Sequence, residues 1–137
     1  MAGTLRVRAE ILEEMLRHAR RESGMECCGL LAGRDGIINT IFPAQNALGS
    51  ATVYEIGPRE LFRAFRQMRE QGLQHLGQYH SHPATENVPS PRDIEQAYYP
   101  EQPYFIVSPR PDEAHPVRAF FIHDGSVREI GIISLET

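Results

Sequence analysis

His80-Ser-His-Pro-Ala-Thr-Glu-Asn-Val-Pro-Ser-Pro-Arg-Asp93 connects a strand-like segment, residues 73–82, to a short predicted helix, residues 90–99. In a strand, residues two apart face the same side, so His80 and His82 should project together and Ser81 away from them. Ser90-Pro-Arg-Asp93 is typical of a helix N-terminus, with a serine cap, a proline at the first position and an acid at the third. The stretch therefore predicts two imidazoles at a strand end, followed by one carboxylate in the first turn of a helix.

These three side chains are candidate metal ligands. Two histidines and one carboxylate can hold a tetrahedral Zn²⁺ and leave one position open, which is the arrangement of catalytic zinc sites. Structural zinc is usually closed by four protein ligands that commonly include cysteine, and the two cysteines of this chain, Cys27 and Cys28, lie in another segment. Helix capping alone would explain Ser90 and Asp93, and a His-x-His pair alone is a weak signal. Their combination predicts a metal site made by His80, His82 and Asp93.

Glu26 is the candidate general base. Hydrolysis at such a metal needs a group that deprotonates the attacking water and passes the proton to the leaving amine. Glu26 stands just before the apolar run 28–33, at an edge where a carboxylate could lean into a cleft. An isolated glutamate at this place would be an ordinary surface residue, so this assignment depends on the metal site.

Together these residues resemble the signature of the JAMM (MPN-type) metalloprotease family, which is a distant Glu, then His-Ser/Thr-His-Pro, six residues, and Ser-x-x-Asp. Here the spacing matches without a gap, and the similarity extends through Tyr54-Glu-Ile-Gly-Pro58, the helix after it and the closing hairpin. The resemblance implies that His80, His82 and Asp93 bind one Zn²⁺ per chain, with Glu26 as general base. It also implies that Ser90 stabilises the oxyanion, while Ser81 supports its strand through hydrogen bonds.

The chain is most similar to short bacterial-type members of that family, which act on ubiquitin-like sulfur-carrier proteins with a Gly-Gly tail. The reaction implied is zinc-dependent hydrolysis of a peptide or isopeptide bond after Gly-Gly. The alternative is a non-catalytic MPN-type scaffold that only binds partner proteins, and the presence of every ligand argues against it. A zinc deaminase would need His-x-Glu and Pro-Cys-x-x-Cys, and neither occurs in the sequence.

The rest of the chain alternates helical and strand patterns. We expect helices at residues 11–21 and 58–72, strands at 28–33, 37–42, 52–56, 73–82, 104–107, 117–123 and 127–135, and turns at Asp35-Gly36 and Asp124-Gly125. The fold class is therefore α/β, a single domain over residues 1–137 with a mixed β-sheet flanked by helices. The family resemblance implies a JAMM/MPN-like, cytidine-deaminase-like sandwich. Residues 52–56 could be an edge along which a Gly-Gly tail adds as a strand, or equally an ordinary strand without a ligand.

Composition narrows the class of protein further. The 137 residues are 41% hydrophobic and 23% charged with a net charge of −4, which argues against disorder and against a broad nucleic-acid surface. The basic runs at residues 17–21 and 63–69 are expected to be solvated helix faces. No apolar run approaches the ~20 residues of a membrane span, no secretory segment is evident, and two adjacent cysteines form no disulfide framework, so a cytoplasmic location is expected. The remaining histidines are predicted to be surface or strand-edge residues, and they are His18, His75, His115 and His123.

Overall fold

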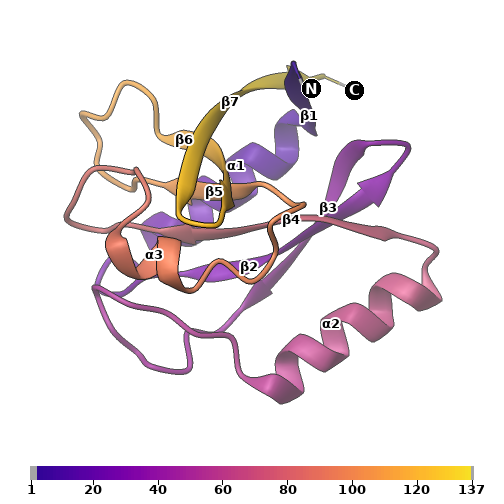
Figure 1. The fold of residues 1–137 in the computed structure, drawn as a ribbon, viewed down its shortest axis with the longest axis horizontal. Helices are drawn as coiled ribbons and strands as arrows, with labels where there is room; N and C mark the ends of the chain where they lie inside the picture. Colours follow the sequence, from indigo (N-terminus) through magenta and orange to yellow (C-terminus); the bar gives the residue numbers. More distant parts are fainter. Residues whose placement is uncertain (1–2, 137) are drawn as a thin grey trace.

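The computed structural model describes residues 3–136 and contains three helices and seven strands. Figure 1 shows their arrangement, in which the first and the last strand lie side by side. In chain order the elements are β1 (Thr4–Arg8), α1 (Ala9–Arg21), β2 (Cys28–Arg34), β3 (Ile37–Ala44), α2 (Pro58–Glu70), β4 (Gln74–Ser81), α3 (Pro91–Glu95), β5 (Tyr104–Val107), β6 (Val117–His123) and β7 (Ser126–Leu135). The expected alternation of helices and strands is confirmed.

The strands form one mixed sheet in the order β1-β3-β2-β4-β5-β6-β7, and β7 pairs back to β1, so the sheet closes on itself. The pairs β1–β3, β1–β7 and β4–β5 are parallel, whereas β2 pairs antiparallel with both β3 and β4. The hairpins turn at Asp35-Gly36 and Asp124-Gly125, where both aspartates and both glycines have positive φ, as tight hairpin turns require. The predicted mixed sheet flanked by helices is confirmed, and closure through β1 is an addition to it.

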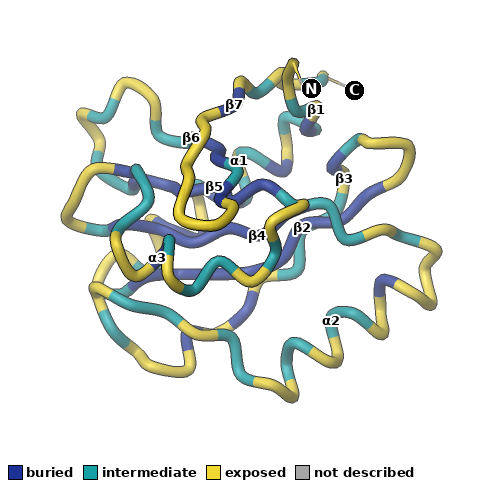
Figure 2. Tube along the Cα trace, viewed as in Figure 1, coloured by how far each residue is buried: buried dark blue, intermediate teal, exposed yellow. Residues whose placement is uncertain are grey.

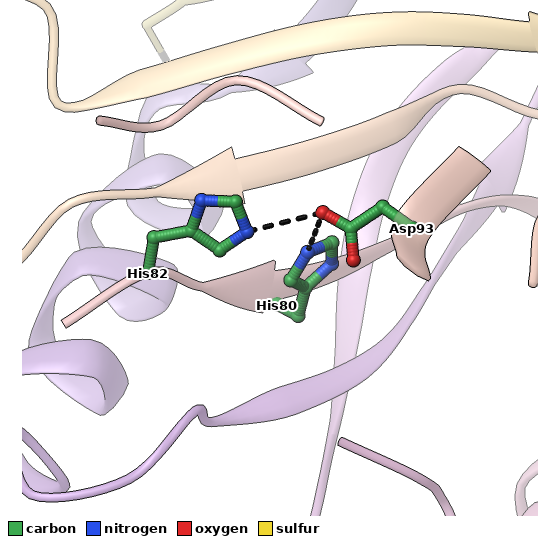
Figure 3. A group of neighbouring side chains, drawn as sticks. All are labelled: His80, His82 and Asp93. Carbon is green, nitrogen blue, oxygen red and sulfur yellow. Dashed lines mark hydrogen bonds and ion pairs between the residues drawn. The ribbon is translucent and has the colours of Figure 1, made fainter. Parts of the chain in front are cut away.

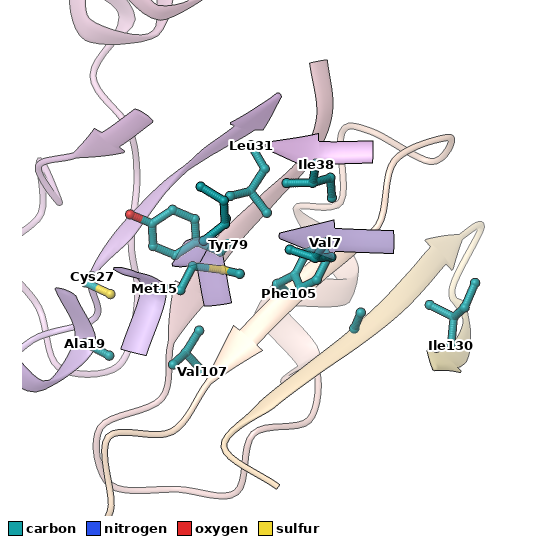
Figure 4. Packing of buried hydrophobic residues seen from close by; sticks show 12 residues of the cluster. Val7, Met15, Ala19, Cys27, Leu31, Ile38, Tyr79, Phe105, Val107 and Ile130 are labelled. Atoms are coloured by element: carbon teal, nitrogen blue, oxygen red, sulfur yellow. The ribbon is translucent and has the colours of Figure 1, made fainter. Parts of the chain in front are cut away.

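The helices cover opposite faces of this sheet. The buried side of α1, including Met15, packs with Tyr79 of β4 and Phe105 of β5 in the largest apolar cluster (Figure 4). On the other face, α2 packs through Met68 against Leu30 of β2. Because side chains alternate along a strand, neighbouring residues of β2 and β4 face opposite helices, while Tyr104 and Ile106 of β5 pack beside Ile94 of α3. Figure 2 shows the central strands buried and the outer sides of the helices exposed.

Residues 52–56 were expected to form a strand, and that expectation is wrong. In this segment only Ile56 forms a bridge, an isolated one with Asn46. The cause is the Asn46 side chain, whose amide donates to the carbonyl of Val53 at 2.9 Å and whose oxygen accepts from the backbone N–H of Glu55 at 3.2 Å. A side chain thus takes hydrogen bonds that a neighbouring strand would otherwise make.

The third helix is shorter than residues 90–99, since it ends at Glu95. Pro100 disfavours helical backbone at the residue before it, and the N–H of Tyr99 donates to the hydroxyl of Tyr104 at 2.8 Å instead of to a helix carbonyl. The N-terminal strand β1 was not expected. Its Leu5 and Val7 alternate with polar residues, which is the pattern of a half-buried strand.

Within residues 3–136, no helix is both long enough and apolar enough to cross a membrane. The arginines of residues 17–21 and of residues 63–69 lie on the exposed sides of α1 and α2, as expected.

Candidate metal centre

His80, His82 and Asp93 meet on the sheet face that α2 and α3 cover (Figure 3). Nε2 of His80 lies 3.0 Å from Oδ2 of Asp93, and Nε2 of His82 lies 3.1 Å from the same oxygen. One potential ligand atom from each residue falls within 4.8 Å of the other two. The three residues are only 1%, 4% and 9% exposed, so the cluster is shielded from bulk water.

The local sequence brings these groups together. His80 is near the end of β4 and faces the same side as Gln78. His82 is the first residue after β4, and its backbone N–H donates to the carbonyl of Val107 at 2.9 Å. Asp93 is the third residue of α3, in the predicted capping box. Ser90 Oγ accepts from the Asp93 N–H and Asp93 Oδ2 accepts from the Ser90 N–H, both at 3.0 Å. The cap therefore fixes the carboxylate toward the strand end.

Buried hydrogen bonds hold the loop between β4 and α3 in place. Asn87 is fully buried, and its side-chain amide donates to the carbonyl of His115 at 2.9 Å and to that of Ile106 at 3.4 Å. Nδ1 of His82 lies 2.8 Å from the carbonyl oxygen of Glu86, which can only accept, so Nδ1 carries a proton. This contact orients the ring and directs Nε2 at the cluster, as backbone carbonyls commonly do for metal-binding histidines.

The electrostatics of the cluster favour a positive charge at its centre. Burial by itself would raise the pKa of Asp93, but the neighbouring imidazoles of His80 and His82 outweigh it and hold that pKa well below its ordinary value. Burial lowers the pKa of His82, yet the hydrogen bond with Asp93 leaves it raised overall. An ionised carboxylate therefore sits between two nitrogen donors in a dry environment.

The donor set fits a divalent metal of the zinc type. Neither ring nitrogen of His80 has a well-aligned hydrogen-bond partner, although both are buried, and buried imidazoles in proteins are rarely left so. Two ligands of a tetrahedral zinc, each at about 2.0–2.1 Å, lie about 3.3 Å apart, close to the nitrogen–oxygen separations seen here. Among residues 3–136, these three are the only group of His, Cys, Asp or Glu that converges in this way.

Glu26 lies beside the cluster and outside it. The β2–β4 register pairs Cys28 with His80, and two residues further along it sets Glu26 against His82 on the same face. The backbone of Glu26 is held on both sides, since its N–H donates to Ser50 at 2.8 Å and its carbonyl accepts from the Asn46 amide at 3.0 Å.

The Glu26 carboxylate is set up to exchange a proton. It is buried, and its Oε1 has no hydrogen-bond partner. Burial and, to a smaller extent, the charge of Asp93 raise the pKa of Glu26 to about 7, while the nearby charge of His82 opposes that rise. A group with such a pKa can both accept and release a proton near neutral pH.

The two serines of the stretch have different roles. Ser81 faces away from the cluster, and its Oγ accepts the N–H of Cys27 at 2.8 Å, which confirms the expected support of the strand. Ser90 Oγ accepts a hydrogen bond in the cap, so its own proton stays available to a further acceptor.

Two residues near the cluster were not singled out from the sequence. The ring of Tyr54 stacks on the ring of His80, with centroids 4.5 Å apart and planes inclined by 19°. Asn46 is buried and bonds the backbone of Glu26, Leu48, Ser50, Val53 and Glu55, so it shapes the whole loop that carries Tyr54. Both residues make contacts with residues far away in the sequence, which local patterns do not predict. In the sequence, only the similarity of Tyr54-Glu-Ile-Gly-Pro58 to the metalloprotease family pointed toward this loop.

A cavity of about 360 Å³ opens beside the cluster. Asp93 and Tyr54 form part of its wall, and the beginning of α2 borders it through Pro58 and Leu61. The remaining wall is mostly aromatic and aliphatic, with Tyr98, Tyr99 and Tyr104 from the segment around and after α3. The segment 53–56 therefore borders the site, although it is not a strand.

His18 was expected at the surface, and that expectation is wrong. The residue is 3% exposed on the buried side of α1, and its Nδ1 lies 2.7 Å from the Tyr79 hydroxyl. His75 is half-buried between the rings of Phe65 and Tyr99, whereas His115 and His123 are exposed as expected.

Comparison with known proteins gives consistent matches. The family of prokaryotic homologues of the JAB domain matches residues 8–123. The chain is 37% identical over 125 residues to the CysO-cysteine peptidase of Mycobacterium tuberculosis, covering 90% of this chain and 86% of that protein. It is 36% identical over 126 residues to a probable TtuB-protein conjugate cleaving protease of Thermus thermophilus, covering 91% and 79%. A solution structure of a protein from Desulfitobacterium hafniense superposes with a TM-score of 0.86 at 37% identity, covering 96% of this chain and 92% of that one.

Proposed function

This chain belongs to the prokaryotic homologues of the JAB domain, of the JAMM/MPN type, and we propose that it is a zinc-dependent peptidase of ubiquitin-like sulfur-carrier proteins. The reaction is hydrolysis of the peptide or isopeptide bond that follows the carrier's C-terminal Gly-Gly. One observation carries the proposal, namely that three potential ligand atoms converge within 4.8 Å beside a buried glutamate. The similarity to a CysO-cysteine peptidase and to a TtuB-conjugate protease supports this substrate class.

His80, His82 and Asp93 would hold one zinc ion. The ring nitrogens of His80, which have no well-aligned hydrogen-bond partner, and the carbonyl contact that orients His82 support this assignment. Two histidines and a carboxylate are a ligand set of catalytic zinc with a position left open. Bound there, zinc would act as a Lewis acid on the scissile carbonyl and make water more acidic.

Glu26 would carry the proton. Its buried, unpartnered Oε1 is available to take a proton from the attacking water. With a pKa of about 7 the carboxyl can then release that proton to the leaving nitrogen, so the peptide bond breaks without an unstable amide anion. Because Glu26 is not part of the converging ligand group, it stays free for this role.

Ser90 would stabilise the oxyanion. The capping box fixes its Oγ as an acceptor from Asp93, which leaves the hydroxyl proton to be donated where negative charge develops on the substrate. The same cap orients Asp93, so one short helix start would serve both binding of the metal and stabilisation of the transition state.

The Gly-Gly preference follows from the crowding around His80. The Tyr54 ring covers one side of that imidazole, and a substrate backbone without side chains can approach most closely there. The proposal takes residues 1–137 as one peptidase domain. It also places the protein in the cytoplasm, where the free thiols of Cys27 and Cys28 would remain reduced.

The test is a Glu26→Gln variant assayed on a ubiquitin-like carrier fused through Gly-Gly to a short peptide. We expect the variant to keep its zinc and fold but to lose about 10²–10⁴-fold in turnover, the usual effect of removing a general base. Glu10→Gln, which alters an exposed glutamate on α1 outside the cavity wall, is the control and should cleave normally. Cleavage by Glu26→Gln at the wild-type rate would refute the assignment.

A further inference from the structure

Arg92 gives the cavity beside the metal centre a positive charge. It is the second residue of α3, directly before Asp93, whose carboxylate points toward the histidines (Figure 3). Among the described residues of the cavity wall, Arg92 is the only basic one, and it is exposed. The wall also contains two acids, Glu55 and Asp93, of which Asp93 is already held by His80 and His82. The cavity therefore presents one cation close to the proposed reaction centre.

The protein itself does not use this charge. Within residues 3–136, no carboxylate forms an ion pair with the guanidinium of Arg92. Glu95 is three residues later on the same short helix, a usual spacing for a helical ion pair, yet the two do not pair. By contrast, Arg118 contacts Glu129 at 2.8 Å. The guanidinium of Arg92 is thus available to a ligand, and a carboxylate matches its forked donors best.

The position of Arg92 relative to Glu26 indicates which part of a substrate it would meet. Burial raises the pKa of Glu26 to about 7, and the charges of His82 and Arg92 both oppose that rise, so Arg92 lies near this carboxyl. Glu26 is the group proposed to pass a proton to the leaving nitrogen. The Gly-Gly tail on the other side of the scissile bond has neither side chains nor charge. An anion bound by Arg92 would therefore belong to the leaving part of the substrate.

Only one kind of leaving group has a carboxylate at the required place. In a terminal amino acid, N–Cα and Cα–C bonds of ~1.5 Å each put the carboxylate within about 3 Å of the scissile nitrogen. Each additional residue moves the terminal carboxylate away by about 3.3 Å. A lysine side chain in an isopeptide has no carboxylate near its nitrogen at all. A fixed guanidinium next to Glu26 can therefore distinguish these leaving groups.

We propose that Arg92 binds the free α-carboxylate of a single amino acid that follows Gly-Gly, and so favours release of a terminal residue over cleavage of a lysine-linked protein. The inference rests on the proposed function, which supplies the scissile bond. Hydrolysis consumes one water and gives the carrier's Gly-Gly carboxylate and a free amino acid, whose nitrogen takes the proton from Glu26. Bidentate binding by Arg92 would hold that nitrogen beside Glu26. A carboxylate on the side chain of the leaving residue has the same chemistry, and the experiment distinguishes the two sources.

The experiment uses one ubiquitin-like carrier with four different leaving groups after Gly-Gly. They are alanine with a free carboxylate, alanine amide, alanylalanine with a free carboxylate, and aspartate amide, whose carboxylate is on the side chain. The test variants are Arg92→Gln and Arg92→Lys. The control is Arg20→Gln, which removes an exposed arginine from α1 on the opposite face of the sheet. The capping box uses Ser90 and Asp93 but not the Arg92 side chain, so the test variants keep it.

We expect the wild type to cleave the alanine acid about 10- to 100-fold better in kcat/KM than the alanine amide, mostly through KM. Alanylalanine and aspartate amide should behave like the alanine amide. In Arg92→Gln the acid-to-amide ratio should fall to about one, while Arg92→Lys should keep part of the preference, because an ammonium has the charge without the fork. Arg20→Gln should keep the whole ratio. Any influence of Arg92 on Glu26 acts on both substrates and cancels in this ratio.

Binding without turnover separates this inference from the proposed function. Calorimetry compares the alanine acid with the alanine amide on Glu26→Gln and on Glu26→Gln/Arg92→Gln. If the acid binds more tightly only while Arg92 is present, and the wild type cleaves neither, the carboxylate site stands and the peptidase assignment falls. If the wild type and Arg92→Gln cleave the acid and the amide equally well, the carboxylate site is wrong and the peptidase assignment stands. Loss of the preference in Arg20→Gln, or cleavage of aspartate amide as fast as the alanine acid, would also overturn it.

Discussion

Strand β4 shows two kinds of surface one residue apart. Tyr79 faces α1 and fills the apolar cluster, where its hydroxyl is paired with His18 at 2.7 Å. Gln78 and His80 face the other side, where His80 has no well-aligned hydrogen-bond partner despite being 1% exposed. The α1 face therefore satisfies its buried polar groups, and the cavity face leaves several of them unsatisfied.

From that difference we infer that the α1 face mainly stabilises the fold and that the cavity face serves the proposed chemistry. An unpartnered buried polar group costs free energy, so proteins keep such groups mainly where a ligand or a reaction needs them. On the cavity face the atoms without a well-aligned partner include Oε1 of Glu26, Oε1 of Gln78 and both ring nitrogens of His80, and the proposed reaction uses those of Glu26 and His80. The two faces can be tested separately because they share strands but not side chains.

The largest effect is expected from removing the proposed metal ligands on the cavity face. His80→Ala/His82→Ala should abolish cleavage and reduce bound zinc from about one per chain to none, because one remaining carboxylate cannot hold the ion. Elemental analysis of the purified variant measures this directly. Tyr79→Phe, which changes the residue just before His80 on the α1 face, should keep both zinc and activity. Full zinc in the double variant would show that these histidines do not bind it.

Removing packing on the α1 face should have the reverse outcome. Phe105 is fully buried in the α1 cluster, and Phe105→Ala should destabilise the fold by about 3–5 kcal/mol through the cavity it leaves. Urea unfolding measures the loss, and zinc content of the folded fraction at low temperature should be unchanged. A loss of zinc in that folded fraction would contradict the independence of the two faces.

How far the sequence predicted these faces depends on how local each signal is. The placement of His80, His82 and Asp93 was predictable because strand alternation and a helix cap act over a few residues, and both are present. Nothing local revealed Asn46, whose five contacts reach backbone groups as far apart as residues 26 and 55. The segment 52–56 was therefore predicted as a strand from its own composition.

His18 shows a different kind of error. It follows Ile11 by seven residues and Met15 by three, so the helical period places it on the buried stripe of α1. Its polarity suggested the surface, but a long-range partner, the Tyr79 hydroxyl, satisfies it inside. Periodicity was the better guide here than residue type. Closure of the sheet through β1 was missed because its pairing with β7 spans nearly the whole chain.

A moderate effect is expected from Asn46, which joins the loop of Tyr54 to the backbone of Glu26. Asn46→Ala leaves backbone groups of the buried loop without partners, which should cost about 1–3 kcal/mol. We also expect a drop in kcat with zinc retained, because Asn46 positions Glu26 without touching the metal ligands. Asn39→Ala on the exposed side of β3 is the matched control. Unchanged kcat would show that the loop holds its shape without this side chain.

The smallest effect concerns His18, a buried histidine of the α1 face. Burial lowers the pKa of His18 below 6.5, although the charge of Glu22, whose carboxylate lies 3.3 Å away, opposes this shift. The unfolded chain therefore binds a proton more readily than the folded one. The stability that His18 contributes is complete above pH 6.5 and is lost as the pH falls toward its folded pKa.

His18→Gln keeps a hydrogen-bonding group but removes this titration. We expect its free energy of unfolding to fall less than that of the wild type between pH 7 and pH 5. The metal ligands titrate equally in both proteins, so they cancel in the comparison, and His123→Gln at an exposed site should behave like the wild type. Parallel curves for the wild type and His18→Gln would mean that His18 accepts its proton inside the fold without cost, and the α1 face would then tolerate a buried charge as the cavity face does.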